Sequence, residues 1–375
     1  MKRVLFFEPN PHHYEVLPGY AKYFIELNYH IDILTNEHIN DGNEFCIANF
    51  DENKICYYNY NSGEGFIKVK ELLDKYIYDF IFISSFDHFV KNERVSVYEE
   101  VKKIDNTKYG IIGCYHSMNN LKYNQEIELL EEKRIITLSE TTYNGIRFYN
   151  ISPIYFKSRQ LYKYKIGICR FLSVGNSNNV NELIFSFDSV LRKNENAELS
   201  FIGGIKKKGF FKSQLKRKIF HPVLSLINFS QYSSSIYKPI CRATRKKIRL
   251  LERVSFENMY DEIMSTDFIV INIDIRRFGD EFHTTRTTGS KNLVLGFEKP
   301  CIIEKRLAKF YGFSEANSII YEDGFLEEAL EKAIKMNSSD YEKLSKGMYK
   351  MQCDLYEKSI SELEDMIKNV QNLRK

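Results

Sequence analysis

The sequence has 375 residues, of which 43% are hydrophobic and 28% charged, and its formal net charge is +4. This length exceeds what one hydrophobic core usually supports and fits two domains. The composition is ordinary for a globular protein, and the content of only 7 prolines and 18 glycines argues against a disordered or fibrous chain.

The first half of the chain alternates short apolar runs with longer amphipathic stretches. Strand patterns occur at 3–9, 31–36, 54–60, 78–86, 108–116 and 134–140, and helical patterns at 19–30, 65–76, 92–105 and 119–133. Strands separated by helices of about 10 to 15 residues are typical of βαβ units on a parallel sheet.

After a connector at 157–167, the alternation starts again. Strand patterns occur at 169–176, 197–204, 248–254, 268–274, 301–305 and 318–323, and helical patterns at 180–194, 256–267, 325–336 and from about Asp340 to Leu373. The sequence therefore predicts an α/β protein with two Rossmann-like domains, over 1–160 and 161–340. The remaining segment, 341–375, is expected to form a helix; the pattern permits this helix to fold back across the joint but does not require it.

The seven cysteines are scattered, and none falls in a Cys-x-x-Cys pair or a Cys/His ligand spacing. This favours reduced thiols in a cytosolic protein over a disulfide framework or a zinc site. The amino terminus turns polar after a few apolar residues, unlike a signal peptide. No apolar run approaches the roughly 18 to 20 residues that cross a bilayer. We expect a cytoplasmic protein without a transmembrane anchor.

Positive charge is concentrated in one segment. Residues 205–251 contain 13 Lys or Arg and no Asp or Glu, which leaves 41 basic and 50 acidic side chains in the rest of the chain. A basic segment inside an otherwise acidic protein indicates an anionic partner.

Ligands of open parallel sheets bind at the carboxyl ends of the strands, so the residues after the strands are candidates for a functional site. In the N-terminal half these are Glu8, His12, His13, Asp87, His88, His116 and Glu140. Structural alternatives stay open. His12 and His13 can be plain polar loop residues. His116 can be bonded to a backbone carbonyl, and Glu140 can cap a helix.

In the C-terminal half, strand ends place small polar residues and a basic loop at the same edge. The small residues are Gly175, Asn176 and Gly204, and the loop contributes Arg276, Arg286, Gly289, Ser290 and Lys291. If a helix begins near Ser290, its first N–H groups would bind a phosphate. Gly289 would let the backbone approach, and Arg286 or Lys291 would add charge. The alternative is a helix that begins at a glycine and carries solvated basic residues.

Four stretches, in their order along the chain, carry a resemblance to a known family. They are GYAKYFIELNYHIDILTN, FLSVGNSNNVNELIFSFDSVLRKNENAELSFIGG, MYDEIMSTDFIVINID and TGSKNLVLGFEKPCII. Together they resemble glycosyltransferases of the GT-B fold, the two-Rossmann-domain enzymes of bacterial lipopolysaccharide and capsule assembly. The resemblance implies two domains facing each other across a cleft, with the acceptor on the N-terminal domain and the sugar donor on the C-terminal domain.

The resemblance also implies a function. The implied enzyme transfers a sugar from a nucleotide-sugar donor, which is a UDP- or GDP-sugar. It does so without a metal or another tightly bound cofactor. The donor contacts would come from Gly175, Asn176, Gly204, Arg276, Glu281, Arg286, Gly289, Ser290 and Lys291. Members of the large retaining family carry two glutamates eight residues apart. Glu281 stands at the first of these positions, and Gly289 occupies the second.

GIIGCYHS places His116 where many members of this family carry an acceptor-side or catalytic histidine. If the enzyme inverts the anomeric centre, a base from the N-terminal domain would deprotonate the acceptor hydroxyl. The candidates for this base are His116, Asp87, His12 and Glu140. The sequence leaves both retaining and inverting chemistry open.

The basic segment, 205–251, is an insertion in the C-terminal domain. Its Lys and Arg residues stand among apolar side chains, a pattern that suits an anionic membrane surface, where each charge contributes about 1 kcal/mol. This agrees with a lipid-linked saccharide acceptor at the inner face of the plasma membrane. The surface would consist of Lys206, Lys207, Lys208, Phe210, Phe211, Lys216, Arg217 and Lys218. A solvated insertion and a nucleic-acid patch are the alternatives, and we expect no nucleic acid among the partners.

Two other functions stay open. A nucleotide-sugar epimerase on the same frame would need acid and base groups on both faces of the sugar and no acceptor surface. A non-catalytic binding protein would use the basic segment alone. A dehydrogenase is disfavoured because no Gly-x-Gly-x-x-Gly follows the strands at 4–9 or 170–176.

Overall fold

The computed structural model describes residues 2–10, 16–36, 52–61, 63–86, 89–90, 95–96, 100, 103–104, 109–117, 132, 134–138, 140, 142–143, 145–154, 167–175, 179–194, 196–203, 242–251, 254–274, 278–284 and 286–373. The chain divides into two compact units. Unit 1 comprises Met1–Gln160, Thr284–Thr287 and Met351–Lys375, and unit 2 comprises Leu161–His283 and Thr288–Lys350.

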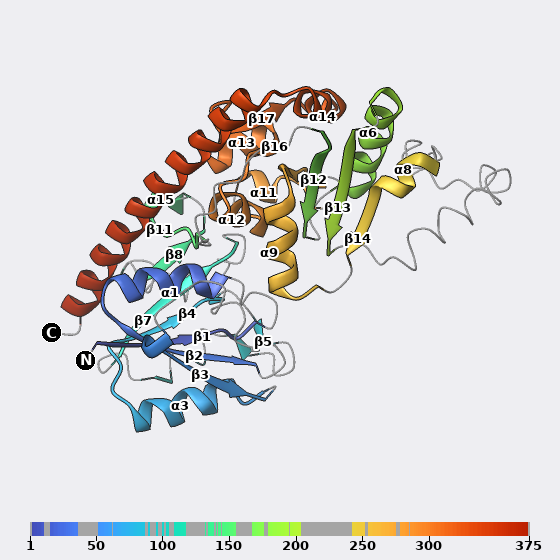
Figure 1. Cartoon of the computed structure of the whole chain (residues 1–375). Coiled ribbons are helices and arrows are strands. Elements are labelled where there is room, and N and C mark those ends of the chain that lie inside the picture. The colour runs from blue at the N-terminus through green and yellow to red at the C-terminus, as the bar shows by residue number, and fades with distance from the viewer. Residues whose placement is uncertain are drawn as a thin grey trace, which may run out of the picture. The chain divides into compact units, whose positions relative to one another are not determined.

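Unit 1 is built on a seven-stranded parallel sheet with the order β11-β8-β7-β4-β1-β2-β3 (Figure 1). Its strands are β1 (Arg3–Phe7), β2 (His30–Asn36), β3 (Ile55–Tyr60), β4 (Phe80–Ile83), β7 (Gly110–Tyr115), β8 (Ile135–Thr137) and β11 (Tyr149–Asn150). The 3-10 turn η2 (Glu52–Lys54) precedes β3. The parallel βαβ architecture predicted from the sequence is confirmed for this unit.

Two short antiparallel pairs lie outside this sheet and were not predicted. They are β5 (Phe89–Val90) with β6 (Val95–Ser96), and β9 (Thr142–Tyr143) with β10 (Ile146–Arg147). The edge strand β11 was also not predicted. A strand of two residues is too short to leave a readable period in the sequence.

Helices α1 (Leu17–Glu26) and α3 (Gly65–Lys75) cover opposite faces of the unit 1 sheet (Figure 1). Side chains alternate along a strand, so Val4 and Phe6 of β1 join the core beneath α1, and Leu5 and Phe7 join the core beneath α3. Burial on both faces explains why the strands read as continuous apolar runs rather than as alternating ones.

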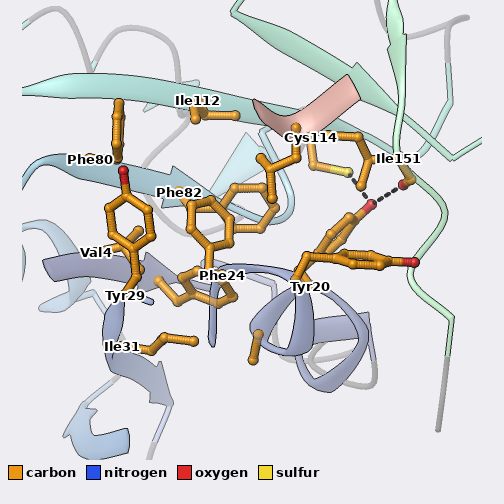
Figure 2. Close-up of a cluster of buried hydrophobic side chains, with 14 of the residues drawn as sticks. Val4, Tyr20, Phe24, Tyr29, Ile31, Phe80, Phe82, Ile112, Cys114 and Ile151 are labelled. Carbon is orange, nitrogen blue, oxygen red and sulfur yellow. Dashed lines mark hydrogen bonds between the residues drawn. The ribbon is translucent and has the colours of Figure 1, made fainter. Parts of the chain in front are cut away.

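Aromatic rings fill the core beneath α1, as Figure 2 shows. The Phe6 ring meets Phe24 edge-on at 5.3 Å between centroids and Phe82 at 4.8 Å. The Tyr20 hydroxyl donates to the Ile151 carbonyl at 3.2 Å. Complete burial raises the pKa of Tyr20 well above its usual value, so the hydroxyl stays a donor and holds α1 to the segment after β11.

Unit 2 contains a six-stranded parallel sheet with the order β14-β13-β12-β15-β16-β17. Its strands are β12 (Cys169–Val174), β13 (Ala197–Ile202), β14 (Ile248–Leu251), β15 (Phe268–Ile271), β16 (Cys301–Glu304) and β17 (Ser318–Tyr321). Its helices are α6 (Val180–Lys193), α8 (Arg242–Lys247), α9 (Phe256–Ser265), α11 (Glu281–Thr284), α12 (Gly289–Gly296), α13 (Lys305–Tyr311) and α14 (Leu326–Ile334). Two parallel α/β sheets confirm the predicted fold class.

The last helix, α15 (Ser338–Leu373), has 36 residues and contributes to both units. In unit 2 its Tyr341 ring meets Phe268 edge-on at 5.4 Å, and the hydroxyl donates to the Asp267 carbonyl at 2.9 Å. In unit 1 its Met366 and Val370 join the core beneath α1. The C-terminal helix that the sequence permitted to fold back therefore does return to the N-terminal unit.

Several predicted segments fall outside the described residues. They include most of the two helical patterns at 92–105 and 119–133, and most of the basic segment, of which α8 and β14 are described. Within 92–105 the structure has the strand β6 at Val95–Ser96, so the predicted helix is wrong at these two residues. Among the described helices, none combines the length and the apolar character needed to span a bilayer.

Candidate active site

Each of the two sheets has one point where the strand order reverses. In unit 1 it lies between β1 and β4, and in unit 2 between β12 and β15. The loops that leave two such strands run to opposite faces of the sheet, and ligands of open parallel sheets bind at the carboxyl ends there. These two points are where a site is expected in each unit.

At the unit 1 reversal, three polar residues follow β1, β4 and β7. The Ser84 hydroxyl donates to the Glu8 carboxylate at 2.6 Å, and the Ser84 carbonyl oxygen lies 2.7 Å from His116 Nε2. Glu8 and Ser84 are fully buried, and His116 is half-buried. The structure thus brings together two residues that the sequence singled out, Glu8 and His116, through a serine that it did not.

The bond to Ser84 determines the protonation of the His116 ring. A carbonyl oxygen can only accept, so Nε2 must carry the proton. In the neutral imidazole the lone pair is then on Nδ1. The structural alternative expected for His116, a bond to a backbone carbonyl, is present in the molecule. It does not exclude a chemical role, because this bond also orients the basic nitrogen.

Arg286 lies beside this histidine in unit 1. Its backbone forms an antiparallel bridge with Ser117, the residue after His116. The sequence grouped Arg286 with Lys291 in one phosphate-binding loop, whereas the structure assigns Thr284–Thr287 to unit 1 and the following residues to unit 2. The loop is therefore divided between the units, and Arg286 is placed near the predicted base.

Of the other predicted bases, Glu140 is described, and it does not join the row formed by Glu8, Ser84 and His116. The Glu140 carboxylate is 69% exposed and pairs with Lys358 of α15 at 3.3 Å. Asp87 and His12 lie outside the described residues. Within the described part of the chain, no three or more His, Cys, Asp or Glu side chains are grouped so that they could hold a metal ion.

At the unit 2 reversal, the amino ends of α6 and α12 meet the carboxyl ends of β12 and β15. The Ser290 hydroxyl in the first turn of α12 donates to the Val174 carbonyl at the end of β12, at 2.8 Å. Asn179 caps α6 through its side chain, and its backbone N–H donates to the Asn272 carbonyl after β15, at 2.6 Å. Two helix starts, each a partial positive charge, are thereby fixed at one edge of the sheet.

Glycines leave the backbone accessible at this edge. Gly175 follows β12 with φ +96°, a left-handed conformation that favours glycine. Gly289 opens α12 and is exposed, and a Cβ placed there would meet no atom within 4 Å. The start of α12 near Ser290 agrees with the helix that the sequence predicted.

Lys291 is 4% exposed, and its Nζ lies 5.5 Å from the centroid of the Tyr311 ring. The Tyr311 hydroxyl accepts the backbone N–H of Thr288, the cap of α12, at 3.3 Å. The ring holds the ammonium by a cation–π contact, so the charge of Lys291 is kept buried against Tyr311 of α13 rather than in solvent.

Two buried acceptors in this region were missed from the sequence. The Asn272 and Asn292 side-chain oxygens are buried and have no hydrogen-bond partner. Asn272 donates its amide to the Asn179 carbonyl at 2.9 Å. Orphaned buried acceptors are uncommon in proteins. The only sequence signal was an asparagine directly after the buried run FIVI.

The remaining predicted donor and membrane residues are placed as follows. Glu281 is half-buried in the short helix α11. The other predicted residues lie outside the described part of the chain. They are Asn176, Gly204, Arg276, Lys206, Lys207, Lys208, Phe210, Phe211, Lys216, Arg217 and Lys218.

No protein-family model matches the sequence, and no curated protein is similar to it at a significant level. Solved structures match over the full length. A glycosyltransferase from Rickettsia africae aligns over 99% of this chain and 98% of its own, with a TM-score of 0.58 and 12% identity. Sucrose-phosphate synthase from Thermosynechococcus elongatus aligns over 100% of both chains, with a TM-score of 0.56 and 11% identity.

The Anabaena protein HepE, solved in complex with UDP-glucose, aligns over 99% of this chain and 100% of its own, with a TM-score of 0.56 and 12% identity. These neighbours are glycosyltransferases of the GT-B fold. With a seven-stranded and a six-stranded parallel sheet in tandem, this chain has the GT-B fold that its sequence resembles.

Proposed function

We propose that this protein is a glycosyltransferase that moves a sugar from a nucleotide-sugar donor to an acceptor hydroxyl. The observation that carries the proposal is the meeting of the α6 and α12 amino ends at the strand-order reversal of unit 2, in a chain with the GT-B fold. This is the place where the physics of parallel α/β sheets favours a phosphate ligand.

The donor diphosphate binds at the start of α12 in this proposal. The Gly289 amide lies in the first turn of the helix, where N–H groups and the helix dipole favour an anion, whereas the Ser290 amide already donates to the Thr288 hydroxyl that caps the helix. Gly289 has no side chain to block the approach of a phosphate. Lys291 supplies a full positive charge in the same turn. As the bond between the sugar and the phosphate breaks, these groups stabilise the negative charge of the leaving nucleoside diphosphate.

The acceptor proton goes to His116 in this proposal. The acceptor oxygen forms a bond to the anomeric carbon while the bond from that carbon to the phosphate oxygen breaks, and the hydroxyl proton passes to Nδ1. The hydrogen bond from Nε2 to Ser84 makes Nδ1 the basic nitrogen of the neutral ring. A single displacement of this kind inverts the anomeric configuration.

Thermal stabilisation by nucleotide sugars tests the donor site. The panel contains UDP-, GDP-, CMP- and dTDP-sugars, with NAD and free nucleotides as controls. We expect one sugar nucleotide to raise the melting temperature, and we place UDP-sugars first because the neighbour HepE was solved with UDP-glucose. No shift with any sugar nucleotide would contradict the proposal.

Replacement of Lys291 by Met tests its role in this site. The substitution keeps the length of the buried side chain and removes its charge, so we expect the Kd for the sugar nucleotide to rise roughly tenfold. Isothermal titration measures this change. Lys305→Met is the matched control, because Lys305 is exposed and pairs with Glu322. An equal Kd in the wild type and in Lys291→Met would remove Lys291 from the donor site.

We further propose a lipid-linked saccharide acceptor, peripheral binding at the inner face of the plasma membrane and a role in surface polysaccharide assembly. The support is the basic and apolar composition of the segment 205–251.

Co-sedimentation with anionic vesicles should be lost when Lys206, Lys207 and Lys208 are changed to Gln. The same three-charge change at Lys332, Lys335 and Lys343 should leave it intact. Equal binding by both variants would contradict membrane docking through this segment.

A further inference from the structure

We propose that Glu8 is a positioning residue that, through Ser84, fixes the ring orientation and the tautomer of His116. This inference rests on the proposed function, in which His116 accepts the proton of the acceptor hydroxyl. It assigns a role to the buried carboxylate of Glu8, which takes no part in the proposed binding of the donor or in the proposed departure of the nucleoside diphosphate.

The burial of Glu8 calls for a physical explanation. Glu8 is 0% exposed, and glutamates are almost never fully buried without partners that compensate for the lost hydration. Its carboxylate accepts the Asn10 backbone N–H and the Ser84 hydroxyl, both at 2.6 Å. Its own carbonyl accepts the Tyr60 hydroxyl at 2.8 Å. Glu8 is therefore a fixed point at the carboxyl end of β1.

Ser84 transmits this fixed geometry from β1 to β7. Its hydroxyl is held by Glu8, and its backbone N–H donates to the Phe7 carbonyl at 3.1 Å. With the side chain and the amide both anchored, the direction of the Ser84 carbonyl is set. That carbonyl accepts His116 Nε2 at 2.7 Å. The row formed by Glu8, Ser84 and His116 thus spans β1, β4 and β7 at the strand-order reversal.

The consequence is chemical as well as structural. A histidine base must present one particular nitrogen, and that nitrogen must be deprotonated before the reaction. If the Ser84 carbonyl changes direction, the His116 ring loses the acceptor that keeps the proton on Nε2. The orientation of Nδ1 is then no longer fixed. Small misplacements of a reacting group are costly.

A second buried carboxylate of the same sheet provides a matched comparison. Asp32 in β2 is 1% exposed and accepts Arg3 Nε at 3.1 Å and the Arg3 Nη2 at 3.0 Å. Arg3 opens β1, so this pair lies toward the amino end of the strands, the opposite edge from Glu8. Loss of Asp32 should cost stability without reaching His116.

The test combines kinetics with nitrogen NMR of the histidine rings in the full chain. In Glu8→Ala we expect kcat to fall about tenfold or more, with the KM for the sugar nucleotide unchanged, because the donor groups lie in unit 2. The nitrogen shifts of His116 should change from one defined tautomer to a mixture. Glu8→Gln keeps one side-chain oxygen that can accept the Ser84 hydroxyl, so it should recover most of the turnover. Asp32→Asn should leave both the kcat and the tautomer as in the wild type.

Folding is followed by thermal melting in every variant. If Glu8→Ala does not fold, Ser84→Ala removes the same hydroxyl–carboxylate bond while keeping the backbone carbonyl, and it replaces Glu8→Ala in both measurements. A wild-type kcat and an unchanged His116 tautomer in a folded variant would overturn the proposal. If the wild type transfers no sugar, the proposed function fails, and the NMR arm alone still decides whether Glu8 positions His116.

Discussion

His116→Ala should lower kcat by about a hundredfold to ten-thousandfold, the range in which a positioned general base contributes. The physical reason is the bond between Nε2 and the Ser84 carbonyl, which leaves Nδ1 as the proton acceptor of the neutral ring. Melting temperature and sugar-nucleotide Kd should stay near those of the wild type, since the ring is only half-buried and the donor groups belong to unit 2. Steady-state kinetics with the donor identified by the thermal panel measures the effect.

The matched control for this experiment is His30→Gln. His30 opens β2 toward the amino end of the sheet, and its backbone N–H donates to the Lys2 carbonyl, so its replacement should leave kcat unchanged. Added imidazole should restore part of the turnover of His116→Ala. The anomeric configuration of the product gives an independent check. A retained configuration, or a kcat near wild type in His116→Ala, would assign the proton to another acceptor and contradict the role of His116.

Lys299→Met should cost about 2–4 kcal/mol of folding free energy, because it leaves two carbonyl groups without their charged donor. Lys299 is 1% exposed, and its Nζ donates to the Met264 carbonyl at 2.9 Å and to the Thr266 carbonyl at 2.7 Å. These carbonyls end α9, where a cation is also favoured by the helix dipole. Methionine keeps the volume of the stem, so the loss measures the ammonium rather than a cavity.

Denaturant unfolding of Lys299→Met and of Lys305→Met measures this difference. Lys305 is exposed and pairs with Glu322 across the surface of unit 2, and such pairs contribute little to stability. Equal unfolding midpoints for the two variants would contradict the capping role of Lys299. The sugar-nucleotide Kd of folded Lys299→Met should equal that of the wild type, because the Lys299 ammonium bonds to the end of α9.

Lys299, which stands before Pro300, shows where a resemblance and a structure give different information. The stretch TGSKNLVLGFEKPCII is one of the four that carry the resemblance, and it contains the predicted donor residues Gly289, Ser290 and Lys291. In the structure its first part does begin a helix at Gly289, at the carboxyl end of β12. Its lysine before the proline instead caps a neighbouring helix of unit 2. The spacing of residues in the sequence cannot tell whether a lysine in this stretch binds the donor or caps a helix, because both roles place a basic residue next to a helix.

The two parallel sheets and the order of their elements could be predicted from the sequence. Runs such as FIFI in β4 and FIVI in β15 are apolar at every position because helices cover both faces of each sheet. The start of α12 was readable for a local reason as well, since Thr288, Gly289 and Ser290 are the residue types that begin helices. These features depend on neighbours a few residues apart.

The composition of the site was decided by the tertiary structure. Ser84 had no sequence signal, because a serine after a strand is ordinary, and only the adjacency of β1, β4 and β7 places it between Glu8 and His116. The sequence predicts one anion site in the basic loop. In the structure, a backbone bridge to Ser117 places Arg286 in unit 1, whereas Lys291 packs over Tyr311 in unit 2. The sequence by itself determined most of the strands and helices of the two parallel sheets, because these follow from local periodicity. Which side chains meet at the candidate site was decided only by pairings between residues far apart in the chain, which no local pattern encodes.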